Sequence, residues 1–274
     1  MSPIKNLFSA VTTFNLDKHP HGVEMVDSFF LNWPEEVKLT AFVENSARLD
    51  DTIVKHKITF KEYHQHIPKY KKFLDNFKDK EKYTDDFRFN VFRFAFKVYA
   101  IDQALKHVKT KYLIWLDADI KTYKKIPLSF LESLVGDEYY MSYLGREKNS
   151  AEHLRYSECG FLIFNTDHLI HSRFWIDMMK MYDSGELFKE KEWHDSYIFD
   201  VVRKKLEKTK NIKNFNISDM DIFNLNNRLN SNDYHVFVVS VLGKFMDHKK
   251  GNRKQFKWSR ELILRVQEEN KNKL

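Results

Sequence analysis

Residues 111–120 read Lys-Tyr-Leu-Ile-Trp-Leu-Asp-Ala-Asp-Ile, so that an apolar run ends directly in two carboxylates, Asp117 and Asp119. A short apolar run bounded by polar residues predicts a strand that is buried on both faces, as in a parallel sheet. Open α/β sheets bind their ligands at the carboxyl ends of such strands. Mg²⁺ and Mn²⁺ prefer oxygen ligands and keep room for substrate phosphates. The stretch therefore predicts a divalent-cation site, and an Asp-rich turn without a ligand is the alternative.

The composition describes a folded chain that favours anionic partners. Its 274 residues are 15% aromatic and include only 7 Gly and 5 Pro, which excludes collagen-like and low-complexity classes and argues against disorder. A net charge of +7 fits nucleic acid, nucleotide phosphates or an acidic membrane surface. The basic residues are spread along the chain except near its end, which weakens the case for nucleic acid.

The cysteine content and the hydrophobic segments bear on the compartment. One cysteine, Cys159, excludes a disulfide within the chain and a Cys-based zinc site. The apolar segment 8–16 is interrupted by Thr and Asn, so no signal peptide is expected. Segment 236–242 is too short to span a bilayer. We therefore expect a cytoplasmic protein without a transmembrane segment.

The hydrophobic pattern predicts a single α/β domain with a central, mostly parallel sheet flanked by helices. Segments 7–14, 22–32 and 37–43 form a strand, a helix and a strand, as in half of a nucleotide-binding sheet. Further strands are expected at 138–144, 161–164 and 236–241, and helices at 60–82, 84–107, 166–182, 193–208 and from 258. No Gly-x-Gly-x-x-Gly and no Gly-Lys-Ser/Thr occurs, which argues against a Rossmann dinucleotide site or a P-loop.

The helix expected at 84–107, with Thr84 as its N-cap, leads directly into the strand that ends at Asp117. Asn90, Arg93 and Lys97 form a polar stripe on it, at positions i, i+3 and i+7. Arg93 and Lys97 can therefore reach the acidic pair and meet phosphate oxygens. A solvated basic face is the alternative.

Three later segments carry further candidate groups. In 157–165, a glycine at 160 just before an apolar strand indicates a close backbone approach, to a ligand or to another element. In 193–196, a His-Asp pair can supply a base or an acceptor-orienting group, or Asp195 can simply cap a helix. In 248–254, an imidazole can complete a metal site, and a glycine and a lysine can hold a diphosphate, unless the segment is a basic surface loop.

The order of these motifs resembles that of GT-A-fold glycosyltransferases, which use nucleotide-sugar donors. Asp117-Ala118-Asp119 is similar to their metal-binding DXD motif, and 157–165 is similar to their Asn-Ser-Gly strand, with Glu and Cys in place of Asn and Ser. The spacing His248-x-x-Gly251-x-x-Lys254 resembles the His-x-x-Gly-x-x-Lys element of the glycogenin-type branch, although Gln and Phe follow where that branch often has Pro-Trp.

The resemblance implies a metal-dependent glycosyltransferase that moves a sugar from a nucleoside-diphosphate donor, with UDP or GDP, to a hydroxyl of a glycan or glycoconjugate. It implies a GT-A domain at 1–256, a basic tail at 257–274, and no nucleic-acid partner. The implied ligands of Mn²⁺ or Mg²⁺ are Asp117, Asp119 and His248. The implied donor-binding residues are Thr13, Asn15, Glu44, Arg93, Lys97, Gly251 and Lys254. Asp195 is the candidate acceptor base if the reaction inverts the anomeric centre, and a positioning group if it retains it.

Other classes compete with this interpretation. A nucleotidyltransferase usually carries a Gly-rich basic loop after its first strand, but residues 15–20 contain no glycine. A haloacid-dehalogenase-like phosphatase requires Thr or Val where Lys121 stands. A nucleic-acid-binding module needs clustered basic and aromatic groups, of which 249–260 offers some. The same basic tail fits peripheral contact with an acidic membrane.

Overall fold

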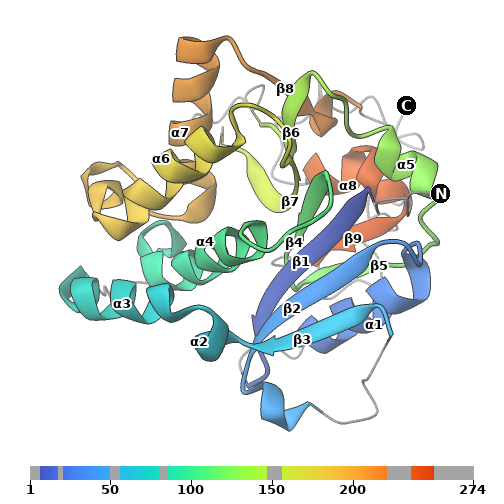
Figure 1. The fold of residues 1–274 in the computed structure, drawn as a ribbon, viewed down its shortest axis with the longest axis horizontal. Helices are drawn as coiled ribbons and strands as arrows, with labels where there is room; N and C mark the ends of the chain where they lie inside the picture. The colour runs from blue at the N-terminus through green and yellow to red at the C-terminus, as the bar shows by residue number, and fades with distance from the viewer. Residues whose placement is uncertain are drawn as a thin grey trace, which may run out of the picture.

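A computed structural model of the protein describes residues 7–17, 21–49, 56–80, 86–146, 156–220 and 236–249. Seven strands form one sheet in the order β3-β2-β1-β4-β7-β6-β8, and β5 and β9 form a short second sheet (Figure 1). The strands are β1 (Phe8–Asn15), β2 (Lys38–Glu44), β3 (Ile58–Glu62), β4 (Tyr112–Leu116), β5 (Ile120–Thr122), β6 (Tyr139–Leu144), β7 (Glu158–Asn165), β8 (Lys213–Asn216) and β9 (Met246–His248). The α-helices are α1 (His21–Asn32), α2 (Tyr63–His66), α3 (Pro68–Phe77), α4 (Val91–Leu105), α5 (Leu128–Glu132), α6 (His171–Asp183), α7 (Asp195–Lys210) and α8 (Val236–Val239).

The large sheet is mixed but mostly parallel, which confirms the predicted fold class. Strands β3, β2, β1 and β4 run parallel to one another, and β8 runs parallel to β6. Only β7 runs antiparallel, against both β4 and β6. The predicted opening unit is present as β1-α1-β2, and its register pairs Asn15 with Glu44 at the carboxyl ends of the two strands.

Helices cover both faces of this sheet and explain why β4 is apolar throughout (Figure 1). Helices α3, α4, α6 and α7 pack on one face, where Leu113 and Trp115 of β4 point. Helices α1, α5 and α8 pack on the other, where Ile114 and Leu116 point. Because side chains alternate between the faces of a strand, burial of every β4 residue requires two cores.

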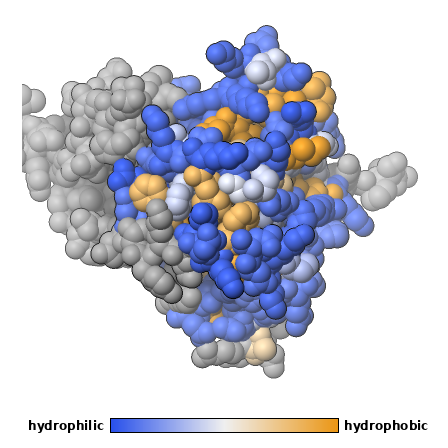
Figure 2. All heavy atoms as spheres, turned by 90° about the vertical axis from the view of Figure 1, so that its left-hand side faces the viewer, coloured by the Kyte–Doolittle hydropathy of each residue, from blue (hydrophilic) through white to orange (hydrophobic). Residues whose placement is uncertain are grey.

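The outer surfaces of the helices are mostly polar. Helix α3 buries Tyr70 and Phe73 and exposes three lysines, Lys69, Lys71 and Lys72, as expected for a helix with one face on the core. Figure 2 shows that the side of the molecule on which α3 and α6 lie is mainly hydrophilic, with apolar side chains visible between polar ones. Within the described ranges, no helix combines the length and the apolarity needed to cross a membrane.

The helix predicted to run from residue 84 begins later than expected. Helix α4 starts at Val91, and the Asn90 side chain caps it by accepting a hydrogen bond from the backbone N–H of Arg93. Asp86 instead caps a separate 3₁₀ turn, Phe87–Phe89, through the N–H of Arg88. The proposed cap at residue 84 lies outside the described residues. Asp86 and Asn90 therefore each begin a separate helical segment, a 3₁₀ turn and α4, in place of one long helix.

The prediction of a strand at residues 236–241 is wrong. These residues form α8 and the start of a 3₁₀ turn, Val241–Lys244. The Ser240 hydroxyl caps that turn by accepting a hydrogen bond from the N–H of Leu242. Since the segment is buried on all sides, its hydrophobicity has no period that distinguishes a strand from a helix.

Other boundaries differ in smaller ways. The segment expected to be helical from residue 60 begins as edge strand β3, and the helix expected from residue 166 begins at His171. Strands β5, β8 and β9 were not predicted from the sequence. The helix expected from residue 258 lies outside the described residues, as does the whole of the proposed tail.

Gly243 tests the packing of the turn that leads into β9. A Cβ built at this position would lie 1.8 Å from the backbone oxygen of Val238, so alanine forces the turn away from α8. We expect Gly243→Ala to lower the free energy of unfolding by about 1–3 kcal/mol. Urea denaturation measures the change. Lys244→Ala, at the exposed neighbouring position, is the control and should change stability by less than about 0.5 kcal/mol.

Candidate functional site

The carboxyl end of β4 holds the acidic pair, and the small β5-β9 sheet brings a histidine to it. Ile120, which follows Asp119, pairs with His248 across the antiparallel β5-β9 ladder. The loop is fixed by backbone hydrogen bonds from the N–H of Asp117 to Gly160 and from the N–H of Lys249 to Asp119. Residues that are distant in sequence are therefore placed on a rigid frame.

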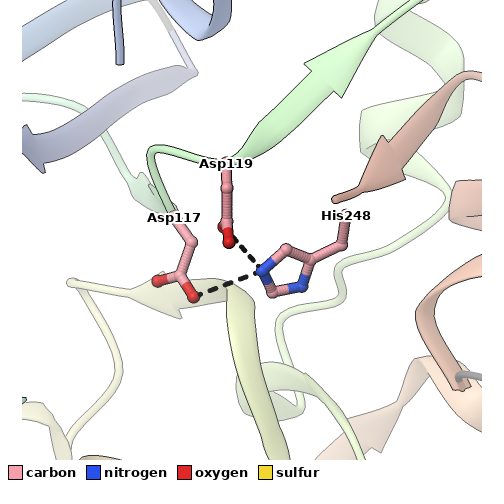
Figure 3. Close-up of side chains that lie close together, drawn as sticks. All are labelled: Asp117, Asp119 and His248. Atoms are coloured by element: carbon pink, nitrogen blue, oxygen red, sulfur yellow. Dashed lines mark ion pairs between the residues drawn. The ribbon is translucent and has the colours of Figure 1, made fainter. Parts of the chain in front are cut away.

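Asp117, Asp119 and His248 converge on one point (Figure 3). Nε2 of His248 lies 2.8 Å from Oδ1 of Asp119 and 3.5 Å from Oδ2 of Asp117. One potential ligand atom from each residue lies within 4.8 Å of the others. The structure thus assembles the three residues that the sequence assigned to a metal, and the histidine is fully buried.

The second oxygen of Asp117 is held by the protein. Oδ1 accepts hydrogen bonds from Nε1 of Trp115 at 2.8 Å and from Nζ of Lys97 at 2.9 Å. These two donors orient the carboxylate so that Oδ2 faces His248. Trp115 lies two residues before Asp117, and Lys97 was expected to reach the acidic pair, but the sequence does not show that both donors share one oxygen of Asp117.

Lys97 joins the acidic pair to Asp195. Its side chain is buried, and Nζ lies 2.9 Å from a carboxylate oxygen of both Asp117 and Asp195 and also donates to the backbone oxygen of Cys159. Burial lowers the pKa of Lys97, but the two carboxylates outweigh it and raise the pKa above its usual range. Lys97 is therefore a permanent cation inside the site, and its predicted contact with donor phosphates stays a prediction.

Arg93, on the same helix, is placed differently. It is exposed, and its guanidinium lies 5.9 Å from the centre of the Phe94 ring. Among the contacts recorded for the described residues, none joins Arg93 to the acidic pair. Of the two cations in the predicted stripe, Arg93 therefore lies on the surface and Lys97 is buried.

His194 and Asp195 have different roles in the structure. His194, not Asp195, is the N-cap of α7, because its Nδ1 accepts the backbone N–H of Tyr197 at 3.4 Å. Its Nε2 lies 2.8 Å from a carboxylate oxygen of Glu192. The alternative in which Asp195 simply caps the helix is therefore wrong, and the carboxylate faces Lys97 instead.

Asn15 and Glu44 meet at the carboxyl ends of β1 and β2, and β1 lies next to β4 in the sheet. The amide of Asn15 donates to one oxygen of Glu44, and Nε2 of His64 lies 2.7 Å from the other. Thr13 sits just inside β1, and its hydroxyl donates to the backbone of Phe42 at 2.7 Å. His64, from α2, is a member of this group that the sequence analysis missed, because it follows the unpredicted strand β3.

Gly160 has the close backbone approach that its position predicted, and the neighbour is another element of the protein. A Cβ at this position would lie 2.4 Å from Cε1 of His248, so only glycine leaves room for the imidazole. The adjacent Cys159 is buried, and burial raises the pKa of its thiol, which argues against a nucleophilic role. Gly251 and Lys254 lie outside the described residues.

No protein-family model matches the sequence, and no curated protein matches it. Structure comparison finds mouse xyloside xylosyltransferase 1, with a TM-score of 0.53 and 13% identity over 89% of this chain and 97% of that one. It also finds the bifunctional glycosyltransferase WbbM, with a TM-score of 0.48 and 13% identity over 74% of this chain and 38% of that one. The galactosyltransferase LgtC follows, with a TM-score of 0.44 and 13% identity over 70% and 69%.

The first of these matches decides the fold. The chain has a GT-A fold. The expectation from the DXD-like segment is thereby confirmed at the level of architecture. The acidic pair and His248 lie at the carboxyl end of β4, where open α/β sheets bind ligands. At 13% identity, the match establishes the fold and leaves the activity to be proposed from the site.

The central role of Lys97 can be tested through stability. Lys97→Met leaves two carboxylates facing each other in a buried region, and we expect the free energy of unfolding to fall by about 3–5 kcal/mol. The measurement is urea denaturation in the presence of EDTA. Lys106→Met, at the residue that follows α4, removes a partly exposed ion pair with Asp102 and should cost less than about 1 kcal/mol. Equal losses in the two variants would contradict the assignment of Lys97 as the buried link.

Proposed function

We propose that the protein is a metal-dependent glycosyltransferase that moves a sugar from a nucleoside-diphosphate donor to a hydroxyl of a glycan or glycoconjugate. The observation that carries this proposal is the convergence of Asp117, Asp119 and His248 at the end of β4 in a GT-A fold. The carboxyl ends of parallel strands are where open α/β sheets place ligands. The proposal follows from the site together with this placement.

The donor atoms fit a divalent cation, and they fit Mn²⁺ better than Mg²⁺. Mg²⁺ favours sites made of oxygen alone, whereas this cluster offers two carboxylates and an imidazole. The charges of the described residues also favour a cation. Among the described residues linked by ion pairs to the cluster, four carboxylates (Asp117, Asp119, Glu158 and Asp195) face two permanent cations (Lys97 and Arg146).

The proposed mechanism assigns a task to each part of the site. Asp117, Asp119 and His248 would hold the cation, which would supply positive charge for the departing diphosphate. Asn15 and Glu44 hold the nucleoside at the ends of β1 and β2. Lys97 fixes the direction of Asp117 and Asp195, so that no reorganisation is needed during the reaction.

Asp195 is proposed as the carboxylate nearest the reacting sugar. In an inverting reaction it takes the proton of the acceptor hydroxyl. In a retaining reaction its fixed negative charge stabilises the oxocarbenium-like transition state and positions the sugar. The anomeric configuration of the product separates these two roles.

The choice of donor is tested by ligand-induced stabilisation. In the presence of Mn²⁺ we expect a UDP- or GDP-sugar, at one hundred times its dissociation constant, to raise the free energy of unfolding by about 2.7 kcal/mol. Thermal unfolding with UDP-, GDP-, CMP- and dTDP-sugars measures this effect. The panel includes a nucleoside-diphosphate xylose, because the structural neighbour is named a xylosyltransferase.

Asp119→Asn should abolish the stabilisation by Mn²⁺ and donor, because it removes a ligand of the cation. Asp137→Asn is the control, since that carboxylate is exposed and pairs with Lys111 outside the cluster. Absence of stabilisation by every donor in the wild-type protein would contradict the proposal. Release of pyrophosphate from a nucleoside triphosphate and a sugar phosphate would instead indicate a nucleotidyltransferase.

Asp195→Asn should separate chemistry from binding. The amide keeps the size of the side chain but removes the charge at the reacting sugar, and we expect kcat to fall by roughly 10²–10³-fold. The dissociation constant of the donor, measured by calorimetry, should change much less because the metal ligands remain. An equal loss of donor binding would show that Asp195 is a structural partner of Lys97 and not part of the chemistry.

A further inference from the structure

We propose that Glu158 is a positioning residue that orients His248 for the metal, and that Arg146 and Gly160 hold Glu158 in place. The inference rests on the proposed metal site and adds an outer layer to it. Glu158 stands where the resembled family has an asparagine. The structure gives this position a different neighbour.

Glu158 is buried at the start of β7, and its two oxygens have separate partners. Oε1 lies 3.3 Å from Nδ1 of His248 and accepts the backbone N–H of Gly160 at 3.1 Å. Oε2 lies 2.6 Å from Nη2 of Arg146. Since both oxygens contact the protein, the carboxylate is fixed in direction and its charge is compensated within the fold.

The two ring nitrogens of His248 lie near different groups and would have different roles. Nε2 points at Asp119 and Asp117, and Nδ1 points at Glu158. A histidine binds a metal through a nitrogen lone pair, so Nε2 must be unprotonated and the proton must reside on Nδ1. A carboxylate that accepts the Nδ1 proton selects this tautomer and makes the ligand nitrogen more basic. Oε1 of Glu158 lies 3.3 Å from Nδ1, which places a carboxylate within reach of this proton, although the angle is not that of a regular hydrogen bond.

The packing around the ring supports the same conclusion. Gly160 leaves room for the imidazole on one side, because any Cβ there would overlap it. The ring of Phe237 lies 5.4 Å from the imidazole in an edge-to-face arrangement. His248 is fully buried between these groups, so that its ring plane is set by contacts on several sides. Glu158 then contacts the Nδ1 edge of a ring that is already confined.

The experiment measures Mn²⁺ affinity directly, by electron paramagnetic resonance of free Mn²⁺ without any sugar donor. Glu158→Ala should weaken binding by roughly 10–100-fold, the usual effect of losing an outer partner of a metal-bound histidine. Glu158→Gln should weaken it less, because the amide oxygen still accepts the Nδ1 proton but lacks the charge. Gly160→Ala should also weaken binding, since its Cβ displaces the ring.

Glu207→Ala is the matched control, because that carboxylate pairs with Arg203 and does not contact His248 among the described residues. Its Mn²⁺ affinity should equal that of the wild-type protein. Unfolding in EDTA checks each variant, and Glu158→Gln carries the test if Glu158→Ala does not fold. The inference also predicts that Arg146→Met weakens Mn²⁺ binding, since it releases Oε2 of Glu158.

The outcomes separate this inference from the proposed function. Wild-type binding of Mn²⁺ with equal affinity in folded Glu158→Ala and Glu158→Gln overturns the role of Glu158 and leaves the metal site standing. Loss of affinity in the Glu207→Ala control as well overturns the role of Glu158, because the effect is then not specific to the His248 contact. Failure of the wild-type protein to bind Mn²⁺ overturns the metal site and the inference together.

Discussion

The contact on which the site depends is the buried ammonium of Lys97 between Asp117 and Asp195. It joins the middle of α4, the end of β4 and the first turn of α7, which are separate parts of the chain. Two carboxylates brought together in a buried region repel each other unless a cation lies between them. The ion pair thus makes the approach of α7 to β4 possible, and it presents both carboxylates in fixed directions before any ligand binds.

A second set of contacts closes the site on the other side. The β5-β9 ladder places His248 against the acidic pair, and Glu158 and Arg146 continue the contacts to Tyr156, whose ring lies 4.5 Å from that of His194. His194 is followed in the chain by Asp195, which pairs with Lys97. The circuit of contacts therefore runs through Asp117, Lys97, Asp195, His194, Tyr156, Arg146, Glu158 and His248. A rigid frame of this kind positions charged groups without relying on the ligand.

The sequence predicted what local patterns encode. The buried strand β4, the β1-α1-β2 unit and the acidic pair follow from hydrophobic runs and their polar ends, and all three are present. The 236–241 segment was misassigned because a fully buried run has no informative period. The polar stripe on α4 indicated that Lys97 reaches the acidic pair. Its second partner, Asp195, and the contact of Glu158 with His248 could not be predicted, since both come from segments that are distant in the sequence. Short strands such as β5 and β9 exist only because they pair with each other.

The charges of the site bear on how a cation and a diphosphate would bind under the proposed function. Within the described part of the cluster, four carboxylates face two permanent cations. A divalent cation held by Asp117, Asp119 and His248 would lower the negative charge that these groups present to a diphosphate. The low polarity of the surroundings would strengthen this effect. The ion pairs of Lys97 with Asp117 and Asp195 keep the two carboxylates in place before any ligand binds.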